Sequence, residues 1–579
     1  MPRQRLLWLI TVSLPLLLFV VAESMLRLTG AGAREPLFVP VASAPGYLQP
    51  NPDAIRRFFP DPARAPDVSI DTTWFPASKA PNTLRIFVQG ESSAAGFPYG
   101  RWASPAALLQ QRLQRAYPDR NVEVINTAMA AVTSYVLLDF ADEIIAQRPD
   151  AIVIYTGHNE FLGIGGVGSS LVSARSPAVA RAIAALRRLH VYRGLERALG
   201  PLLGPQEDPL ATRGGTLMAR VARERSIPLG SNLYARGEQQ FRGNLERLLD
   251  KYRRAGVPVF IGTLVSNLRD QPPFVSVVPS GPESAQARYE SAQALDRAGR
   301  YESALDEYVL AKDLDGLRFR APASFDGAIR EVAARHGATV VDVGEAFARA
   351  ARDGIVGADL MLEHVHPNVE GYLQLASAFY HPLVKWAGPP GVAIDDAQAR
   401  QEIPVTEVDR LAGDYRVLLL RNDWPFVPER RAVTLPSPTN AIERVAQAWF
   451  AGRLTWTDAM RNAMDAYQAD GNVAEAARVA VNLADAFVTS GATQYTAGRL
   501  LLRAGQPERA LRYLERAASL DTAGTTVEYR LSLAEALART GAADRSIKTL
   551  EAILRRHPND ERAKYWLQEM RLRQEDASN

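Results

Sequence analysis

The sequence predicts an α/β domain with a parallel five-stranded sheet, followed by an all-α C-terminal domain. In residues 81–390, short β-branched runs alternate with amphipathic helical stretches, a pattern typical of a parallel sheet covered by helices on both faces. From residue 441 onward the pattern is almost entirely helical, and glycines recur at similar intervals between helices.

The composition excludes several other classes of protein. A chain of 579 residues is too long for one core, so we expect two or three domains. Its 47% hydrophobic and 23% charged residues are ordinary for folded protein, and a net charge of +3 does not suggest a nucleic-acid partner. The chain has 0 cysteines, which excludes disulfides, thiolate zinc sites and a cysteine nucleophile.

The N-terminus predicts a location outside the cytoplasm. Arg3 and Arg5 precede an uncharged run at residues 6–22, which is at the short edge of what spans a bilayer. Because basic residues stay on the cytoplasmic side, we expect residues 1–28 to be a single-pass membrane anchor, with the later domains outside the cytoplasm. A signal peptide cleaved after Ala22 is the alternative, and a buried core helix is a third.

Residues 29–80 are rich in proline, alanine and aspartate and have weak periodicity, so we expect a linker that packs on the next domain. The sheet domain should follow at residues 81–390. Its first helix begins with Ser104 and Pro105, an N-cap hydroxyl followed by a ring that needs no donor. The expected strands are residues 84–89, 122–126, 151–156, 257–264 and 338–343, and the expected helices include residues 105–117, 135–147, 239–254 and 326–336.

Two stretches interrupt this alternation. Residues 163–232 hold helix-like runs and loops rich in glycine and proline, and we expect them to form a wall or lid over the site. Residues 283–317 predict two short antiparallel helices with small residues where they touch, similar to a repeat hairpin. Residues 391–440 are expected to connect the sheet domain to the C-terminal domain.

Residues 441–579 predict tetratricopeptide-like repeats. Gly471, Gly505 and Gly541 each follow an amphipathic helix and precede another, with spacings of 505 − 471 = 34 and 541 − 505 = 36 residues. A period near 34 residues in helix–turn–helix form is typical of these repeats. Such units bury their faces only by stacking, so we expect one short superhelix that binds a protein partner. An unrelated helical bundle is the alternative.

A serine and a carboxylate–histidine pair are the leading candidates for catalysis. Ser92 follows the first expected strand in a turn of small residues, where a carbonyl group can approach the backbone closely. Serine needs a base within hydrogen-bond reach, and His366 follows Glu363 at i+3, so a turn would fold the carboxylate onto the imidazole. His364 is the rival base. A metal site of Glu363, His364 and His366 is a further alternative, but it lacks obvious additional ligands.

Donors for a developing oxyanion are expected close by. Asn159 lies just past the third expected strand, and its side-chain amide can donate a hydrogen bond. The backbone N–H of Ser92 and the N–H near Ala131 can supply the other donors. Structural alternatives exist for two of these residues: an incidental hydroxyl in a tight turn for Ser92, and a strand-end Asx turn for Asn159.

In their order along the chain these motifs resemble the SGNH family, also called GDSL hydrolases. The resemblance covers about residues 84–386. Compared with the family pattern, Glu91 and Glu363 replace aspartates and Ala131 replaces a glycine. The four matching blocks are Gly90-Glu91-Ser92, Asn126-Thr127-Ala128-Met129-Ala130-Ala131, Gly157-His158-Asn159 and Glu363-His364-Val365-His366.

The resemblance implies a flavodoxin-like sheet and a serine esterase that needs no metal and no organic cofactor. It implies that Ser92 is the nucleophile, that His366 is the base and that Glu363 orients His366. It also implies that Ser92, Ala131 and Asn159 bind the oxyanion. The whole layout is similar to membrane-anchored bacterial SGNH proteins fused to tetratricopeptide repeats. This similarity implies an anchor in a bacterial inner membrane, with the catalytic and repeat domains in the periplasm.

Three functions are therefore open. The first is hydrolysis of an O-acyl ester, for which an acetyl group on an envelope carbohydrate is the expected example. The second is O-acyl transfer, which would use the same residues and exclude water from the acyl-enzyme. The third is a non-catalytic envelope scaffold that binds proteins through its repeats. The near-complete set of Ser92, Asn159 and His366 favours catalysis over the scaffold.

Overall fold

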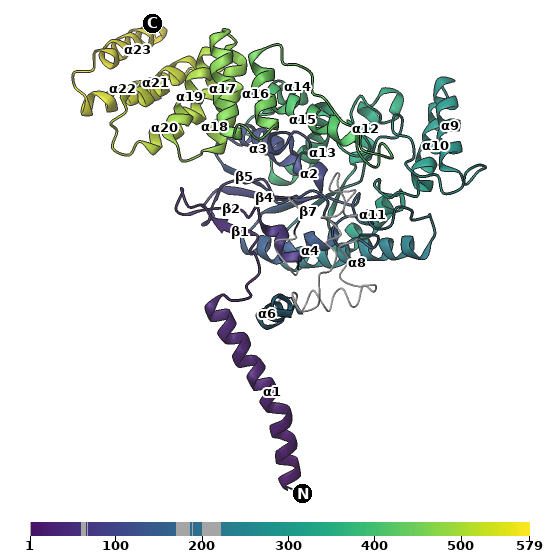
Figure 1. The fold of residues 1–579 in the computed structure, drawn as a ribbon. Helices are drawn as coiled ribbons and strands as arrows, with labels where there is room; N and C mark the ends of the chain where they lie inside the picture. Colours follow the sequence, from purple (N-terminus) through teal and green to yellow (C-terminus); the bar gives the residue numbers. More distant parts are fainter. Residues whose placement is uncertain are drawn as a thin grey trace. The chain divides into compact units, whose positions relative to one another are not determined.

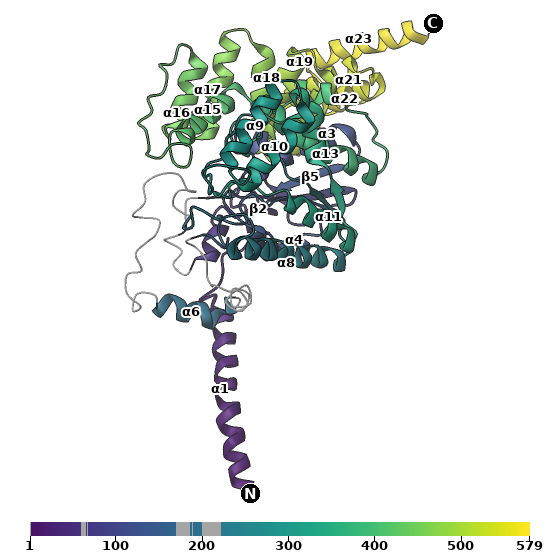
Figure 2. The same cartoon turned by 90° about the vertical axis from the view of Figure 1, so that its right-hand side faces the viewer.

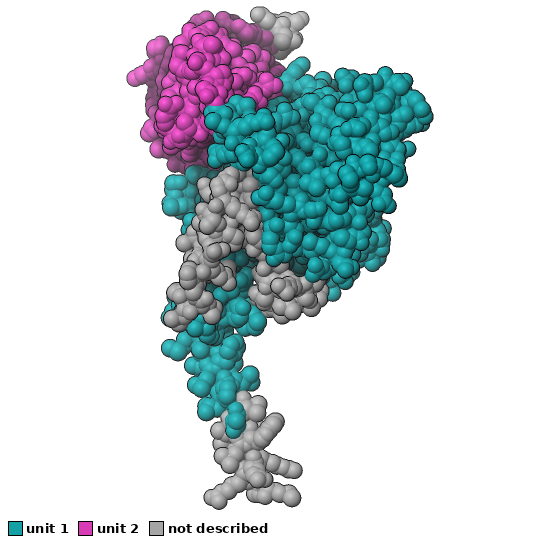
Figure 3. Space-filling model, turned by 45° about the vertical axis from the view of Figure 1, so that its right-hand side comes forward, with its two compact units in different colours: residues 1–401, 417–433 teal, residues 402–416, 434–579 magenta. Residues whose placement is uncertain are grey.

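The computed structural model of the protein describes residues 2–59, 65, 68–169, 186–187, 189–199 and 222–578. The chain divides into two compact units (Figure 3). The first unit comprises Met1–Gln401 and Val417–Val433, and the second comprises Glu402–Arg416 and Thr434–Asn579. A short segment of the first unit is therefore flanked on both sides, in the sequence, by residues of the second.

The five expected strands form one parallel sheet in the first unit, which confirms that prediction. Their order is β5-β4-β6-β7-β8, so the chain enters the sheet next to one edge and then crosses to the other (Figure 1). Most residues of these strands are buried, because helices cover both faces of the sheet. They are β4 (Thr83–Gly90), β5 (Asn121–Asn126), β6 (Ala151–Tyr155), β7 (Val259–Gly262) and β8 (Thr339–Val341).

The two faces of the sheet carry separate groups of helices (Figure 1, Figure 2). Ser104 starts α3 as expected, because its hydroxyl accepts a hydrogen bond from the N–H of Ala107 at 3.2 Å. One face is covered by α3 (Pro105–Ala116), α12 (Val343–Ala350) and α13 (Val369–Ala387), and the other by α4 (Ser134–Ala146), α8 (Asn232–Arg254) and α11 (Ser324–His336).

A helix, α1 (Pro2–Thr29), forms where we expected the membrane anchor. The expected transmembrane segment is nevertheless not found, because no helix among the described residues has both the length and the apolar character that a membrane crossing requires. Near the end of α1, Glu23 accepts hydrogen bonds from the N–H groups of His190 and Val191, at 3.1 and 2.9 Å. These groups begin α6 (His190–Leu199), so the carboxylate ties the two helices together.

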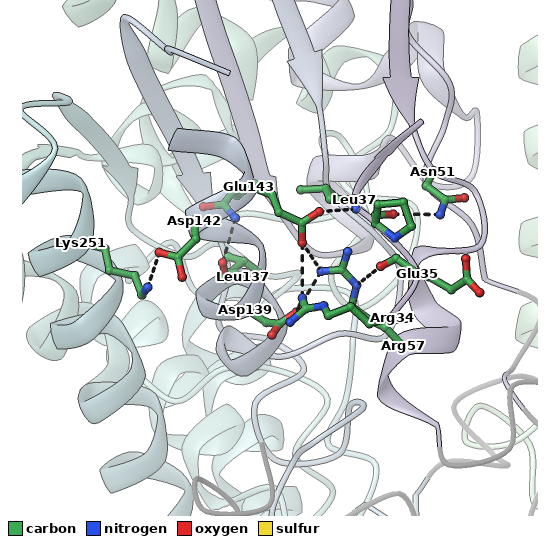
Figure 4. A network of polar contacts seen from close by, with 12 residues as sticks. Arg34, Glu35, Leu37, Asn51, Arg57, Leu137, Asp139, Asp142, Glu143 and Lys251 are labelled. Atoms are coloured by element: carbon green, nitrogen blue, oxygen red, sulfur yellow. Dashed lines mark hydrogen bonds and ion pairs between the residues drawn. The ribbon is translucent and has the colours of Figure 1, made fainter. Parts of the chain in front are cut away.

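Much of the stretch that we expected to be a linker is folded. It contains a small antiparallel sheet of β1 (Phe38–Pro40), β2 (Tyr47–Pro50) and β3 (Phe75–Pro76). Arg57 is buried and pairs with Asp139 and Glu143 of α4, at 3.1 and 2.7 Å (Figure 4). Two carboxylates around one guanidinium offset the cost of burying it, so this stretch packs on the sheet domain through specific ion pairs.

The two interruptions of the sheet pattern differ in how far the structure describes them. Of the expected lid, residues 163–232, the residues 170–185, 188 and 200–221 lie outside the described residues. The described part of this stretch contains α6. The second interruption forms α9 (Ala285–Arg297) and α10 (Tyr301–Leu314), which lie side by side with buried alanines in their contact (Figure 1).

The described residues of the second unit form helices joined by turns and loops, and from residue 441 onward each helix packs on the next. The glycines that define the expected period, Gly471, Gly505 and Gly541, have φ values of 73°, 72° and 79° and lie in the turns after helices, where glycine is favoured. The helices from the end of the first unit onward are α14 (Asp396–Gln401), α15 (Glu407–Arg421), α16 (Ala441–Phe450), α17 (Trp456–Ala469), α18 (Val473–Ala486), α19 (Gly491–Arg503), α20 (Pro507–Leu520), α21 (Val527–Arg539), α22 (Ala543–Arg556) and α23 (Glu561–Ser578).

Candidate active site

Ser92 begins a short helix directly after the carboxyl end of β4. The turn between strand and helix is tight, because a Cβ on Gly90 would lie 2.2 Å from the carbonyl oxygen of Tyr155 in β6. Only glycine fits that position. The helix, α2 (Ser92–Ala95), ends at Gly96, which has a φ of 96°. Ser92 itself is half-buried and keeps part of its surface exposed.

The Ser92 hydroxyl meets the His366 imidazole, although 274 positions separate the two residues. Oγ of Ser92 lies 2.7 Å from Nε2 of His366. The other ring nitrogen, Nδ1, contacts Oε1 of Glu363, whose side chain is buried. Burial by itself would raise the pKa of Glu363, but its contacts with His364 and His366 hold that pKa well below the ordinary value. The carboxylate is therefore ionised beside the imidazole.

A short turn brings Glu363 back onto His366. The backbone N–H of His366 donates to Oε1 of Glu363 at 3.1 Å, and the N–H of Leu362 donates to the carbonyl oxygen of His366 at 2.8 Å. Asn368 then caps α13 by accepting a hydrogen bond from the N–H of Gly371 at 2.9 Å. This turn lets a glutamate, with its longer side chain, reach the imidazole.

The turn is also fixed against the short helix that carries Ser92. The hydroxyl of Ser93 donates to the carbonyl oxygen of Val365 at 3.0 Å. The ring of Phe97 lies 4.5 Å from the ring of His366, and the hydroxyl of Tyr372 donates to the Phe97 carbonyl oxygen at 2.6 Å. Packing and hydrogen bonds together hold the imidazole beside the serine.

His364, the rival base, faces Glu363 instead of Ser92. Its Nδ1 contacts Oε2 of Glu363, the oxygen that His366 leaves open. Of the two candidate bases, the structure brings only His366 to the serine. In the part of the chain that the structure describes, no group of three or more histidine, aspartate or glutamate side chains is placed to hold a metal ion.

The expected oxyanion residues Ala131 and Asn159 lie against the same glycine. A Cβ on Gly163 would lie 2.8 Å from the carbonyl oxygen of Ala131 and 2.8 Å from Cβ of Asn159. Ala131 has a φ of 58°, a left-handed conformation that favours glycine. Its carbonyl oxygen accepts a hydrogen bond from the N–H of Ile164 at 2.7 Å. The turn therefore holds this conformation with alanine in place of glycine.

Glu91 has a role that the sequence did not reveal. Its buried carboxylate accepts hydrogen bonds from the Thr156 hydroxyl at 2.8 Å, the Gly157 N–H at 2.8 Å and the Asn159 N–H at 3.1 Å. Burial raises the pKa of Glu91 to about 8 against the effect of these three donors. Because Glu91 precedes Ser92, its carboxylate links the serine turn to Asn159. An acidic residue next to the serine was the only sequence signal.

A serine, an imidazole and a buried carboxylate, aligned at the carboxyl ends of a parallel sheet, define a candidate serine hydrolase. Residues 88–373 match the GDSL-like Lipase/Acylhydrolase family, and residues 495–576 match the tetratricopeptide repeat. The chain thus carries a GDSL-like lipase/acylhydrolase domain fused to a tetratricopeptide repeat region, as the sequence predicted. It is a hydrolase that acts on ester bonds.

Several solved structures are similar to this chain. The lipase/acylhydrolase from Enterococcus faecalis is 16% identical, with 53% of this chain and 100% of that chain covered and a TM-score of 0.27. TesA is 16% identical, with 52% and 99% covered and a TM-score of 0.25. The psychrotrophic esterase EstA from Pseudoalteromonas sp. is 13% identical, with 53% and 98% covered and a TM-score of 0.24. No curated protein matches the chain.

Proposed function

We propose that the protein is a serine esterase in which Ser92 forms a covalent acyl intermediate. Nε2 of His366 takes the hydroxyl proton while Oγ of Ser92 attacks the ester carbonyl carbon. The carbonyl oxygen becomes an oxyanion, for which the N–H groups of Ser92 and Ala131 and the side-chain amide of Asn159 are the proposed donors. Glu363 orients His366 and stabilises the imidazolium that forms.

The cycle closes with the same residues. The imidazolium gives its proton to the alcohol oxygen as the bond between carbon and that oxygen breaks. Water then attacks the acyl-serine, His366 takes a proton from the water, and collapse of the second intermediate releases the acid and returns a proton to Oγ of Ser92. The observation that carries the proposal is the 2.7 Å distance between Oγ and Nε2, which is short enough for direct proton transfer.

We propose O-acyl esters as the substrates, with an acetyl group on an envelope carbohydrate as the leading example. This choice rests on the proposed location of the protein outside the cytoplasm. The repeat region indicates a protein partner in addition.

The proposed location is supported by Arg3, Arg5 and the uncharged run at residues 6–22. Alkaline phosphatase fused after Asn579 should be active, because that reporter requires disulfides that form only in oxidising compartments. The matched fusion to β-galactosidase, which is active in the cytoplasm, should be inactive. An inactive phosphatase fusion together with an active β-galactosidase fusion would place the domains in the cytoplasm and contradict the proposal.

A fluorophosphonate probe should label the folded protein at Ser92. The activated hydroxyl attacks phosphorus and displaces fluoride, which leaves a stable adduct that peptide mass spectrometry can assign. The Ser92→Ala variant should show no labelling and no hydrolysis of p-nitrophenyl acetate, and heat-denatured wild type is the control for non-specific reaction. Equal labelling of wild type and Ser92→Ala, or a folded wild type that does not react, would contradict the proposed function.

A further inference from the structure

The second carboxylate oxygen of Glu363 faces a histidine that the proposed mechanism does not use. Nδ1 of His364 is a buried nitrogen whose one polar contact among the described residues is Oε2, while His366 occupies Oε1. The backbone N–H of Val365 is the other group that reaches Oε2 among the described residues, at 3.3 Å. Burial lowers the pKa of His364, so its ring is neutral at neutral pH and can donate one hydrogen bond through Nδ1.

Three aromatic rings, which we call the aromatic cage, surround the ring of His364. Phe274, Phe319 and Phe426 lie 5.5, 5.8 and 5.5 Å from it between ring centroids, each in an edge-to-face arrangement. Phe274 also packs edge-on against Phe426 at 5.3 Å. Edge-to-face contacts of this kind are favourable beyond the burial of the rings, so the cage restricts rotation of the imidazole.

Phe426 lies in the segment Val417–Val433. This segment belongs to the first unit, although the residues before and after it in the sequence belong to the second. A turn presents its ring, because the carbonyl oxygen of Asp423 accepts a hydrogen bond from the N–H of Phe426 at 3.0 Å. Trp424 in the same turn packs on Phe319 at 5.6 Å between centroids. The segment therefore contacts the cage through two rings.

We infer that His364 and Phe426 are positioning residues for the Glu363 carboxylate. The cage holds the His364 ring, and His364 holds Oε2 while Oε1 faces His366. A glutamate side chain has one more rotatable bond than the aspartate of the family pattern, and a donor on its second oxygen removes that freedom. This inference rests on the proposed function, because it concerns the orientation of the base in that reaction.

Two substitutions of His364 separate a hydrogen-bonding role from a steric one. His364→Phe fills the space of the ring without a donor and should lower kcat by about 10²-fold with KM nearly unchanged, since a small displacement of the base has an effect of that size. His364→Asn keeps a side-chain N–H for Oε2 and should retain at least roughly tenfold more activity than His364→Phe. A purely steric role predicts the opposite order, so that order would overturn the inference.

Substitutions of Phe426 test the cage. Phe426→Ala should lower kcat by about tenfold, whereas Phe426→Tyr, which keeps the ring, should stay close to wild type. Trp386→Ala is the matched control, because it removes an edge contact with Phe260 at 5.9 Å elsewhere in the same unit and should leave kcat unchanged. Thermal unfolding of every variant shows whether it is folded. If His364→Phe is not folded, the Phe426 variants provide the test of the inference.

The outcomes distinguish this inference from the function on which it rests. If the fluorophosphonate labels Ser92 while His364→Phe and Phe426→Ala keep the wild-type kcat, the inference is wrong and the esterase proposal stands. If the folded wild type does not react, both fail. Loss of kcat in these two variants, with recovery in His364→Asn and Phe426→Tyr, supports the positioning role.

Discussion

Replacing His366 by alanine should lower kcat/KM for a p-nitrophenyl ester by about 10⁴-fold or more, because residues of a nucleophile–base pair act as one unit. The substitution removes the group that lies 2.7 Å from Oγ of Ser92, and no other histidine contacts that oxygen among the described residues. Without an acceptor, the hydroxyl is a weak nucleophile at neutral pH. The fluorophosphonate should therefore also label this variant far more slowly than wild type.

The control for this prediction is a histidine of similar chemistry outside the site. His336 ends α11 and its Nε2 lies 2.8 Å from a carboxylate oxygen of Glu246. His336→Ala should keep the wild-type kcat/KM, whereas His366→Ala should not. An active His366→Ala variant would mean that another group is the base and would remove the main support for the mechanism.

Above about pH 8, where the Glu91 carboxyl is ionised, replacing Glu91 by glutamine should lower kcat by about 10²-fold, the effect expected when an oxyanion donor is misplaced. The glutamine oxygen can still accept hydrogen bonds from Thr156 and Gly157. Its amide nitrogen, however, would face the N–H of Asn159, so two donors would oppose each other. Asn159 should then move relative to Ser92. Steady-state kinetics should show this as a fall in kcat, with KM much less affected.

The same substitution should change how stability depends on pH. Burial raises the pKa of Glu91 from 4.5 to about 8. Between these two pH values Glu91 is protonated in the folded state and ionised in the unfolded state. The contribution of this group to stability is therefore complete below about pH 4.5 and is lost as the pH rises through about 8. Relative to Glu91→Gln, wild type should lose about 1.4 kcal/mol per pH unit in this window. Urea unfolding at several pH values measures that difference.

Glu160→Gln is the matched control for Glu91. Burial raises the pKa of Glu160 to about 7, and its carboxylate accepts hydrogen bonds from the N–H and hydroxyl of Ser134 and from Gln240, at 3.0, 2.9 and 2.9 Å. It has no hydrogen bond to the serine turn among the described residues. Glu160→Gln should therefore change the pH dependence of stability in the same direction but lower kcat much less. Equal losses of kcat would contradict a specific role for Glu91.

Local patterns in the sequence were sufficient for the five-stranded sheet and for the candidate residues Ser92, Glu363 and His366, but not for the small sheet at residues 38–76. Strand periodicity located β4, and the residue types after it identified Ser92 as a nucleophile candidate. The i+3 spacing of Glu363 and His366 predicted a contact that one turn of backbone can make. These features depend on a few consecutive residues, and for that reason they could be predicted without knowledge of the fold.

The tertiary structure alone decided which distant groups meet. The sequence favoured His366 over its rival His364 as the base, and packing of their turn against Ser93 and Phe97 places the His366 ring beside the serine. The hydrogen bonds of Glu91, the contact of Phe426 with His364 and the ion pairs of Arg57 likewise join residues far apart in the chain. Such contacts depend on strand order and side-chain packing, and the local pattern around each residue carries no record of its partner.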